Sequence, residues 1–410
     1  MEPADSATVV ANNADLLTEI LVRVPVKPLM TFKCVSKEWL SFISGPQFCR
    51  NHVLRGYHHH TFPSYLLLTP SPEMEDNDVS TKIISMIPLP LKSSNDEFSL
   101  QLECDFTIKQ SCNGLLLLQG VKLNGERHTV YYCVCNPATS QIVNLDFKGT
   151  DVYYLFLAFD PLISSHFKVL SFAFMGEDVS PDSDLQLEDF NIFMYLSETG
   201  QWNDLGLRIP HNYMQRPSSM LSTGSGAYVN GGIYWHNEYD DNSMYFDLEN
   251  QCLNSFPMPS NIEYDQDIDY FGASGGHLHM TLVKFGYASI YDLVDILELK
   301  EDNSEWLVKF RVDLTPMLVA FPDWNLHLKS MSSPFFYVLS IVCQNDENDS
   351  QLVFFIHDTI MSYNFVNCTF TKLTSFQPLL ESEPSRLKEV FQYTESLCWV
   401  GAHNKCLTCK

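Results

Sequence analysis

The residues best suited to bind a metal ion stand at two places in this chain. Three adjacent histidines occupy 58–60, but neighbouring side chains on a strand point to opposite faces, so they do not readily share one ion. Cys406 and Cys409 form a CxxC pair at the C-terminus, with His403 nearby. One such pair supplies half of a zinc site. We therefore expect no metal site and interpret the pair as two incidental thiols in a tail.

Candidate catalytic groups are scattered carboxylates and a short glycine-serine run. Asp265, Asp267 and Asp269 alternate along the chain, which places them on one face of a strand or in a solvated loop. General acid–base catalysis needs a positioned pair, and this spacing does not define one. The run Gly224-Ser225-Gly226 lacks the following helix and the Lys-Ser/Thr pair of a phosphate-binding loop. The sequence predicts no catalytic residue and no cofactor.

The composition narrows the range of partners. The formal net charge is −25, from 50 acidic and 25 basic side chains, so nucleic acid and anionic membrane surfaces are unsuitable partners. A basic or neutral protein partner fits this charge better than nucleic acid does, and an acidic surface exposed to water explains the charge without any partner. The N-terminal residues lack the pattern of a secretory signal, and the apolar runs are too short to span a membrane. With cysteines inside apolar runs, we expect a reduced protein of the cytoplasm, the nucleus or both.

The stretch from 13 to 55 is the part with a helical pattern. Asn13 is a helix cap, and Leu17, Ile20, Leu21 and Val24 follow at helical spacing. Further along, Pro28 suits the start of a second helix, Ser36 the cap of a third, and Pro46 the start of a fourth. Each helix is too short to be stable alone. Their apolar residues exceed what one small core can bury, which indicates a partner surface.

This stretch resembles an F-box of the plant type, with the pattern LLxEILxRVPVKxLxxFKCVSKxWLSFIS. The matching residues are Leu16, Leu17, Glu19, Ile20, Leu21, Arg23, Val24, Pro25, Val26, Lys27, Leu29, Phe32, Lys33, Cys34, Val35, Ser36, Lys37, Trp39 and Leu40. The resemblance implies docking onto a Skp-type adaptor and, through it, onto a cullin ubiquitin ligase. One departure is that Ala11-Asn12-Asn13-Ala14 stands where the family usually has a Leu-Pro pair.

The resemblance also implies a set of adaptor-binding residues, some of which must belong to the module's own core. We expect this set to comprise Leu16, Leu17, Ile20, Leu21, Pro25, Val26, Leu29 and Trp39. The alternative interpretation is that the helices only cover the open end of the β domain.

From Ser64 onward the chain consists of short apolar runs separated by turns. The turn Asn230-Gly231-Gly232 joins two such runs into a hairpin, because it supplies the positive backbone angles that a tight turn needs. Sets of short strands recur every 40 to 55 residues or so, which is typical of a β-propeller. A final run, 396–400, is expected to pair with the first strands. A β-sandwich or two stacked β domains remain alternatives.

This region resembles the F-box-associated domain of plant F-box proteins, with kelch-like blades. The matching segments are SCNGLLLL (111–118), VCNPATSQIVNL (134–145), FDPLISSHFKVLSF (159–172), GGIYW (231–235) and MYFDLENQ (244–251). Their order along the chain is more specific than any single segment.

We therefore expect an α+β multidomain chain, in which a small N-terminal three-helix F-box precedes a mainly-β, propeller-like domain. The expected divisions are a disordered N-terminus (1–12), the F-box (13–55), a linker (56–63), the β domain (64–402) and a tail (403–410). The function implied is a non-catalytic substrate receptor of a Skp–cullin–F-box ubiquitin ligase, with an unidentified target bound by loops such as 73–80, 176–188, 236–243 and 260–270. The alternatives are a propeller enzyme acting on glycans and an interaction protein with a degenerate F-box.

Overall fold

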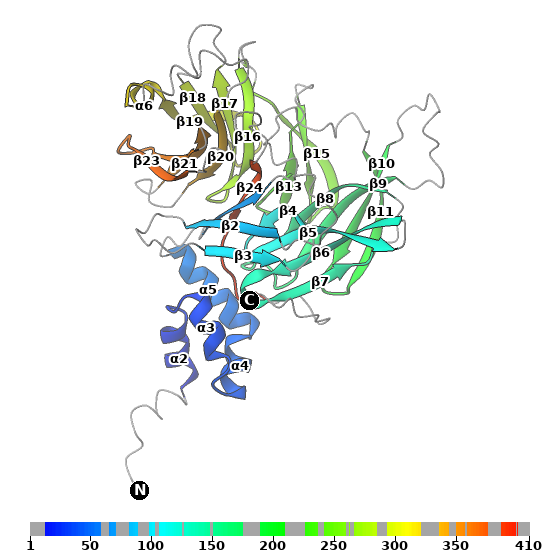
Figure 1. The fold of residues 1–410 in the computed structure, drawn as a ribbon. Helices are drawn as coiled ribbons and strands as arrows, with labels where there is room; N and C mark the ends of the chain where they lie inside the picture. The colour runs from blue at the N-terminus through cyan, green and yellow to red at the C-terminus, as the bar shows by residue number, and fades with distance from the viewer. Residues whose placement is uncertain are drawn as a thin grey trace, which may run out of the picture.

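The computed structural model confirms the expected architecture, a small helical module followed by a β-propeller (Figure 1). It describes residues 13–58, 65–70, 82–88, 98–102, 106–124, 127–147, 151–174, 189–209, 226–236, 242–259, 262, 266–284, 293–320, 336–343, 350–356, 359–375, 387–398 and 400. None of the helices in these segments combines the length and apolar character needed to cross a membrane. The runs at 59–60, 224–225 and 403–409, and Asp265, lie outside the described residues.

The helical module contains four described helices, and the fourth begins at Pro46 as the sequence indicated. They are α2 (Ala14–Leu21), α3 (Val26–Phe32), α4 (Lys37–Ile43) and α5 (Pro46–His58). Both predicted caps are confirmed: the Asn13 side chain accepts hydrogen bonds from the backbone N–H groups of Asp15 and Leu16, and Ser36 Oγ accepts one from Trp39 N–H at 3.2 Å. The second helix begins at Val26 rather than Pro28, because Pro25 occupies the cap position and leaves Pro28 in the first turn, where no backbone donor is needed.

The β domain consists of six four-stranded antiparallel sheets in the described part of the chain. Blade one combines β1 (Tyr65–Pro70), β2 (Lys82–Pro88), β3 (Phe98–Leu102) and β24 (Leu387–Tyr393). Blade two contains β4 (Thr107–Cys112), β5 (Leu115–Asn124), β6 (Arg127–Asn136) and β7 (Gln141–Leu145), with a 3-10 turn, η1 (Pro137–Thr139), before its last strand. Blade three contains β8 (Asp151–Ala158), β9 (Lys168–Phe174), β10 (Phe190–Leu196) and β11 (Gln201–Ile209).

The remaining blades have the same order of strands. Blade four contains β12 (Ala227–Val229), β13 (Gly232–Trp235), β14 (Asn242–Asp247) and β15 (Cys252–Pro257). Blade five contains β16 (Gln266–Ser274), β17 (His277–Lys284), β18 (Leu293–Leu299) and β19 (Trp306–Asp313), followed by α6 (Thr315–Ala320). Blade six contains β20 (Phe336–Val342), β21 (Gln351–Ile356), β22 (Thr359–Asn364) and β23 (Phe370–Ser375).

The inner strands form a closed ring. The strands β4, β8, β12, β16, β20 and β24 each contact the next, and β24 contacts β4. Blade one is therefore built from both ends of the β domain: β24 is its inner strand and pairs antiparallel with β1, with Tyr393 opposite Tyr65. This corrects the expectation that 396–400 pairs with the first strands, because the preceding run closes the ring.

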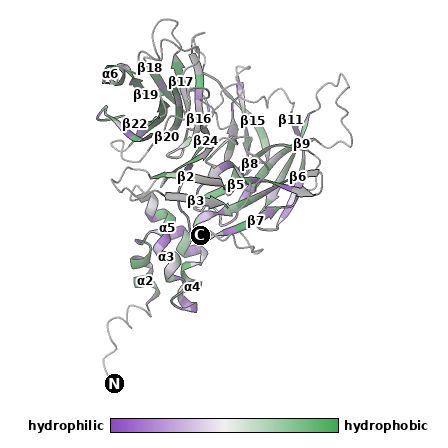
Figure 2. Cartoon of the chain, viewed as in Figure 1, coloured by the Kyte–Doolittle hydropathy of each residue, from purple (hydrophilic) through white to green (hydrophobic). Residues whose placement is uncertain are grey.

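Apolar side chains fill the spaces between blades and between the ring and the helices. The hydropathy colouring of the ribbon shows apolar residues, in green, in both the helices and the strands (Figure 2). One core cluster joins the helical module to the propeller. It contains Leu29 and Phe48 from the helices, Leu117 from blade two, Phe159 from blade three and Leu397 from the C-terminal segment. The helices and the β domain thus bury their apolar surfaces against each other.

Candidate docking surfaces

The helical module presents apolar side chains to solvent from α2 and from the α3–α4 region. Leu16 and Ile20 lie one turn apart on α2, with 44% and 50% of their surface exposed. Val35, after α3, is 63% exposed, and Leu40 on α4 is 48% exposed. We call these four residues the exposed apolar set. Large apolar side chains left in solvent on so small a module are unusual for a cover that only seals another domain.

The eight residues expected to contact an adaptor divide into three groups. Leu16, Ile20 and Pro25 are exposed, Leu17 and Trp39 are half-buried, and Leu21, Val26 and Leu29 are buried. The buried three pack in the cluster shared with the propeller. In this chain they support the surface from beneath, and a direct adaptor contact by any of the eight stays a prediction.

Two residues of the exposed set, Val35 and Leu40, were not among the expected contacts. Both belong to the F-box pattern, so their types were visible in the sequence. Their exposure depends on how α4 packs: Trp39 turns inward, with its ring edge against Phe32 at a centroid distance of 5.9 Å, and so leaves Leu40 outward. A heptad or helical-wheel argument on seven residues cannot fix that orientation.

The opposite side of the helical module is held against the propeller by specific polar contacts. Cys49 Sγ on α5 donates to the carbonyl oxygen of Leu397 at 3.4 Å. Burial raises the pKa of the Cys49 thiol to about 12, so this group stays protonated and serves as a donor. Helix α3 also lies against η1 of blade two. Burial raises the pKa of Glu395, and the positive charge of Lys27 on α3 opposes that shift.

A central cavity of about 280 Å³ opens among the inner strands. Gln110 braces its wall: its side-chain amide donates to the carbonyl oxygens of Leu157 and Gly226, and its oxygen accepts from Leu157 N–H at 2.6 Å. Among the described residues that line the cavity, Asp160 supplies the one carboxylate, and Leu162 N–H already donates to it. Glycoside hydrolysis in its usual form needs two carboxylates across the bond to be cleaved, so the described wall does not provide that arrangement.

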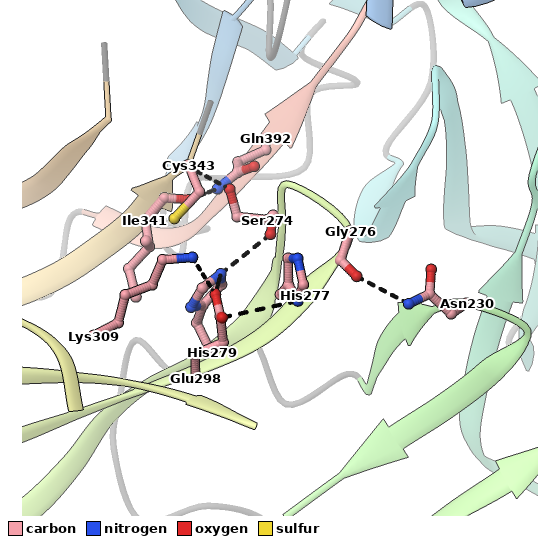
Figure 3. A network of polar contacts seen from close by, with 10 residues as sticks. All are labelled: Asn230, Ser274, Gly276, His277, His279, Glu298, Lys309, Ile341, Cys343 and Gln392. Carbon is pink, nitrogen blue, oxygen red and sulfur yellow. Dashed lines mark hydrogen bonds and ion pairs between the residues drawn. The ribbon is translucent and has the colours of Figure 1, made fainter. Parts of the chain in front are cut away.

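The segment Gly272–Gly276 reads GASGG, which has the GxSxG spacing of a hydrolase nucleophile and was not predicted as a site from the sequence. The structure places it in the β16–β17 hairpin rather than at a strand-to-helix turn. Ser274 Oγ accepts a hydrogen bond from Cys343 N–H at 2.8 Å, and the ring of His279 contacts the carbonyl oxygen of Ser274 (Figure 3). The hydroxyl is thus used to join blades five and six, and no nucleophile–base pair forms there among the described residues.

Glu298 on β18 is the centre of a polar network that includes His277 and His279 of the same hairpin (Figure 3). Glu298 lies 3.9 Å from His277 and 3.7 Å from His279, and it forms an ion pair with Lys309. Burial lowers the pKa of His279 to about 4, against the opposing effect of Glu298, so this ring is neutral near pH 7. In the described residues no group of three His, Cys, Asp or Glu side chains has the geometry to hold a metal ion. We interpret the network as a structural feature that holds the strands of blade five together. Asp269 has a comparable role, since its carboxylate accepts a hydrogen bond from Val338 N–H of blade six.

Comparison with known proteins assigns both parts of the chain. Residues 67–315 match the model of the F-box associated beta propeller domain, and residues 13–51 match the F-box domain. The chain belongs to the F-box proteins with an associated β-propeller. It is 29% identical to the F-box protein At5g07610 of Arabidopsis thaliana, over 96% of this chain and 94% of that protein. It is 26% identical to F-box only protein 8 of the same plant, over 60% of this chain and 80% of that protein.

Membership in this family agrees with the arrangement of the two parts. The F-box match ends at residue 51, inside α5, and the helix continues to His58, into the stretch expected to be a linker. Among solved structures, an oligogalacturonate lyase from Vibrio parahaemolyticus aligns with 77% of this chain and 90% of its own, at 10% identity and a TM-score of 0.35.

Proposed function

We propose that this F-box protein is a substrate receptor of a Skp–cullin–F-box ubiquitin ligase. The F-box binds a Skp-type adaptor, and the propeller binds a target protein. The observation that supports the proposal most directly is the exposed apolar set. It lies on a module whose other side packs into the core of the propeller. The receptor acts by proximity, since holding a target beside the ubiquitin-carrying arm raises its effective concentration.

The propeller's connectivity supports target binding on the face away from the F-box. Each inner strand ends, and each second strand begins, at the face where the helices pack: β24 and β1 meet there through Tyr393 and Tyr65. The described strand ends that flank 73–80 (β1 and β2), 176–188 (β9 and β10), 236–243 (β13 and β14) and the start of 260–270 (β15) lie at the opposite face. Variable binding segments usually connect strand ends of this kind on a rigid scaffold.

The charge of that face favours a basic target segment. Loops 73–80 and 176–188 together contain nine carboxylates and neither Lys nor Arg. Electrostatic complementarity of this kind accelerates association and selects against acidic partners. The expected signature is a target affinity that falls as ionic strength rises.

The test of the adaptor half uses the full chain, because deleting the F-box would expose the core that it shares with the propeller. The double variant Ile20→Lys with Leu40→Lys is titrated with a purified Skp-type adaptor. The matched control is Leu307→Lys on blade five, a leucine with the same 48% exposure as Leu40 but on the outer strand of the propeller. We expect the control to bind as the wild type does and the double variant to lose binding. Equal binding by all three chains would refute docking through the exposed apolar set.

The target half is tested with proteins captured from plant extract. Replacing the five carboxylates of 176–188 by amides should remove target proteins from the captured set, whereas the Ile20→Lys, Leu40→Lys variant should retain them and lose the adaptor. A captured set that does not change when the loop is neutralised would place the target elsewhere.

A further inference from the structure

The segment that follows the last strand is buried although it belongs to no blade. Strand β24 ends at Tyr393, and the ring is complete at that point. Ser396, Leu397, Cys398 and Val400 nevertheless lie buried in the chain. Leu397, Cys398 and Val400 belong to the cluster that also contains residues of α2–α5 and of blades two and three. We call residues 394–400 the C-terminal strap.

Three successive carbonyl groups of the strap accept hydrogen bonds, alternately from the propeller and from the F-box. Asn136, at the end of β6, donates from its amide nitrogen to the carbonyl oxygens of Ser396 at 3.0 Å and Cys398 at 2.8 Å. The carbonyl oxygen between them, that of Leu397, accepts from Cys49 Sγ on α5. The strap is therefore bonded to the propeller on one side and to the F-box on the other.

Both the amide nitrogen and the oxygen of the Asn136 side chain form hydrogen bonds in this region. The residue has no exposed surface, and its side-chain oxygen accepts from the N–H groups of Ala138 and Thr139 in η1, the turn that lies against α3. A buried amide with both its donor and its acceptor ends bonded specifies one arrangement of its partners. This residue thus holds the strap and the turn under the F-box in a fixed relation.

The turn at Gly114 shows how closely the strap is fitted. Gly114 has a φ of +89°, and a Cβ added there would lie 2.3 Å from Ser396 Cβ and 2.8 Å from the carbonyl oxygen of Thr394. Both Asn136 and Gly114 belong to the segments that resemble the F-box-associated domain, VCNPATSQIVNL and SCNGLLLL. These two segments therefore contain residues that contact the strap and hold it in place.

We propose that the C-terminal strap fixes the F-box to the propeller, so that the adaptor surface and the target face keep one relative orientation. Ring closure does not need the strap, since β24 and β1 are already paired upstream of it. The inference concerns the free chain and holds whether or not an adaptor binds, so its test requires no adaptor.

The experiment compares two leucine substitutions by hydrogen–deuterium exchange of the full chain. Leu397→Ala removes a buried side chain from the strap, and Leu339→Ala removes one of the same type from inner strand β20, in a cluster that lacks F-box residues. We expect Leu397→Ala to raise amide exchange in α3–α5 by at least about tenfold while the strands of blades one, four, five and six keep their protection. Leu339→Ala should raise exchange in blades one and six and leave α3–α5 unchanged.

A second variant keeps the proposal testable if Leu397→Ala does not fold. Asn136→Asp removes the two bonds to the strap, keeps an acceptor oxygen for the N–H groups of η1 and leaves every leucine in place, so the same rise in α3–α5 is expected at smaller amplitude. Exchange that rises equally in the helices and in all blades would make the strap part of ring closure, which overturns the inference. Unchanged exchange in α3–α5 for both variants would also overturn it.

Discussion

Ile20 and Leu21 are neighbours on α2 whose replacement should have opposite consequences. Ile20 is 50% exposed in the free chain, and Leu21 is 3% exposed. Ile20→Lys should weaken adaptor binding and leave folding intact, because lysine is a good helix former and its charge suits the last turn of α2. Leu21→Ala should destabilise the F-box, because the side chain lies in the shared core.

The expected magnitudes follow from burial. Fully burying an isoleucine side chain contributes about 1.5–3 kcal/mol, so covering the exposed half of Ile20 with an adaptor contributes about 1 kcal/mol, or roughly fivefold in Kd. A charge placed in that contact adds an uncompensated group, and the total loss should reach at least about 3 kcal/mol, roughly a hundredfold. Leu21→Ala should cost about 2–5 kcal/mol of unfolding free energy.

Calorimetric titration with a purified Skp-type adaptor measures the first effect, and thermal unfolding of the free chain measures the second. Ile20→Lys should keep the wild-type melting temperature while its Kd for the adaptor rises. Wild-type affinity in Ile20→Lys would show that α2 does not face the adaptor. A melting temperature unchanged in Leu21→Ala would show that the F-box core is not the one described.

Three further outcomes test the propeller and the thiols. Gly114→Ala should cost about 2 kcal/mol or more in urea unfolding, whereas Gly231→Ala, with a similar positive φ but nothing within 4 Å of the new Cβ, should cost only about 1 kcal/mol; equal costs would contradict the tight seat at residue 114. The pKa of His279 is lowered by burial from 6.5 to about 4, so the unfolded chain binds more protons between these values and stability falls as pH falls through them, by up to about 1.4 kcal/mol per pH unit; His279→Gln should flatten that part of the curve, and an unchanged slope would refute the assignment. Maleimide should label exposed Cys34 in the folded chain while Cys49, with a pKa raised to about 12, resists; mass spectrometry showing equal rates would contradict its burial.

The helix caps could be predicted from the sequence because their interactions are local. Asn13 and Ser36 bond to backbone groups two or three residues away, so the residue type and its position suffice. Which apolar residues face outward could not be predicted in the same way. Ile20 and Leu21 belong to one helical pattern, and only packing against the propeller separates the exposed residue from the buried one.

The propeller was recognisable from its turns and recurring strand sets, and its closure was not. The turn Asn230-Gly231 has the positive φ values expected, 45° and 84°, and joins β12 to β13 as predicted. Strand β24, LKEVFQY, carries charged residues and lacks the apolar run of 396–400, which is why the later run was expected to pair with the first strands. The outcome depends on a partner more than 300 residues away, and no local pattern encodes such a pairing.

Asn136 shows the same limit at a single residue. The sequence Asn-Pro after an apolar run predicts a turn, and η1 follows it. The contacts with the strap at residues 396 and 398 have no local signature, because both partners are backbone carbonyl groups. A residue that resembles an ordinary turn former is thus a fully buried junction.

Because blade one takes its inner strand from the far end of the chain, synthesis on the ribosome imposes an order on assembly. The F-box and strands β1–β3 leave the exit tunnel before the later blades, yet β1 lacks the partner on its inner edge, β24, until residue 393 has been made. During synthesis the first blade stays incomplete, with the inner edge of β1 unpaired, while the five later blades form. A premature stop codon anywhere upstream of β24 therefore leaves that edge open for good, and the product would be a substrate for chaperones and proteases rather than a shorter receptor.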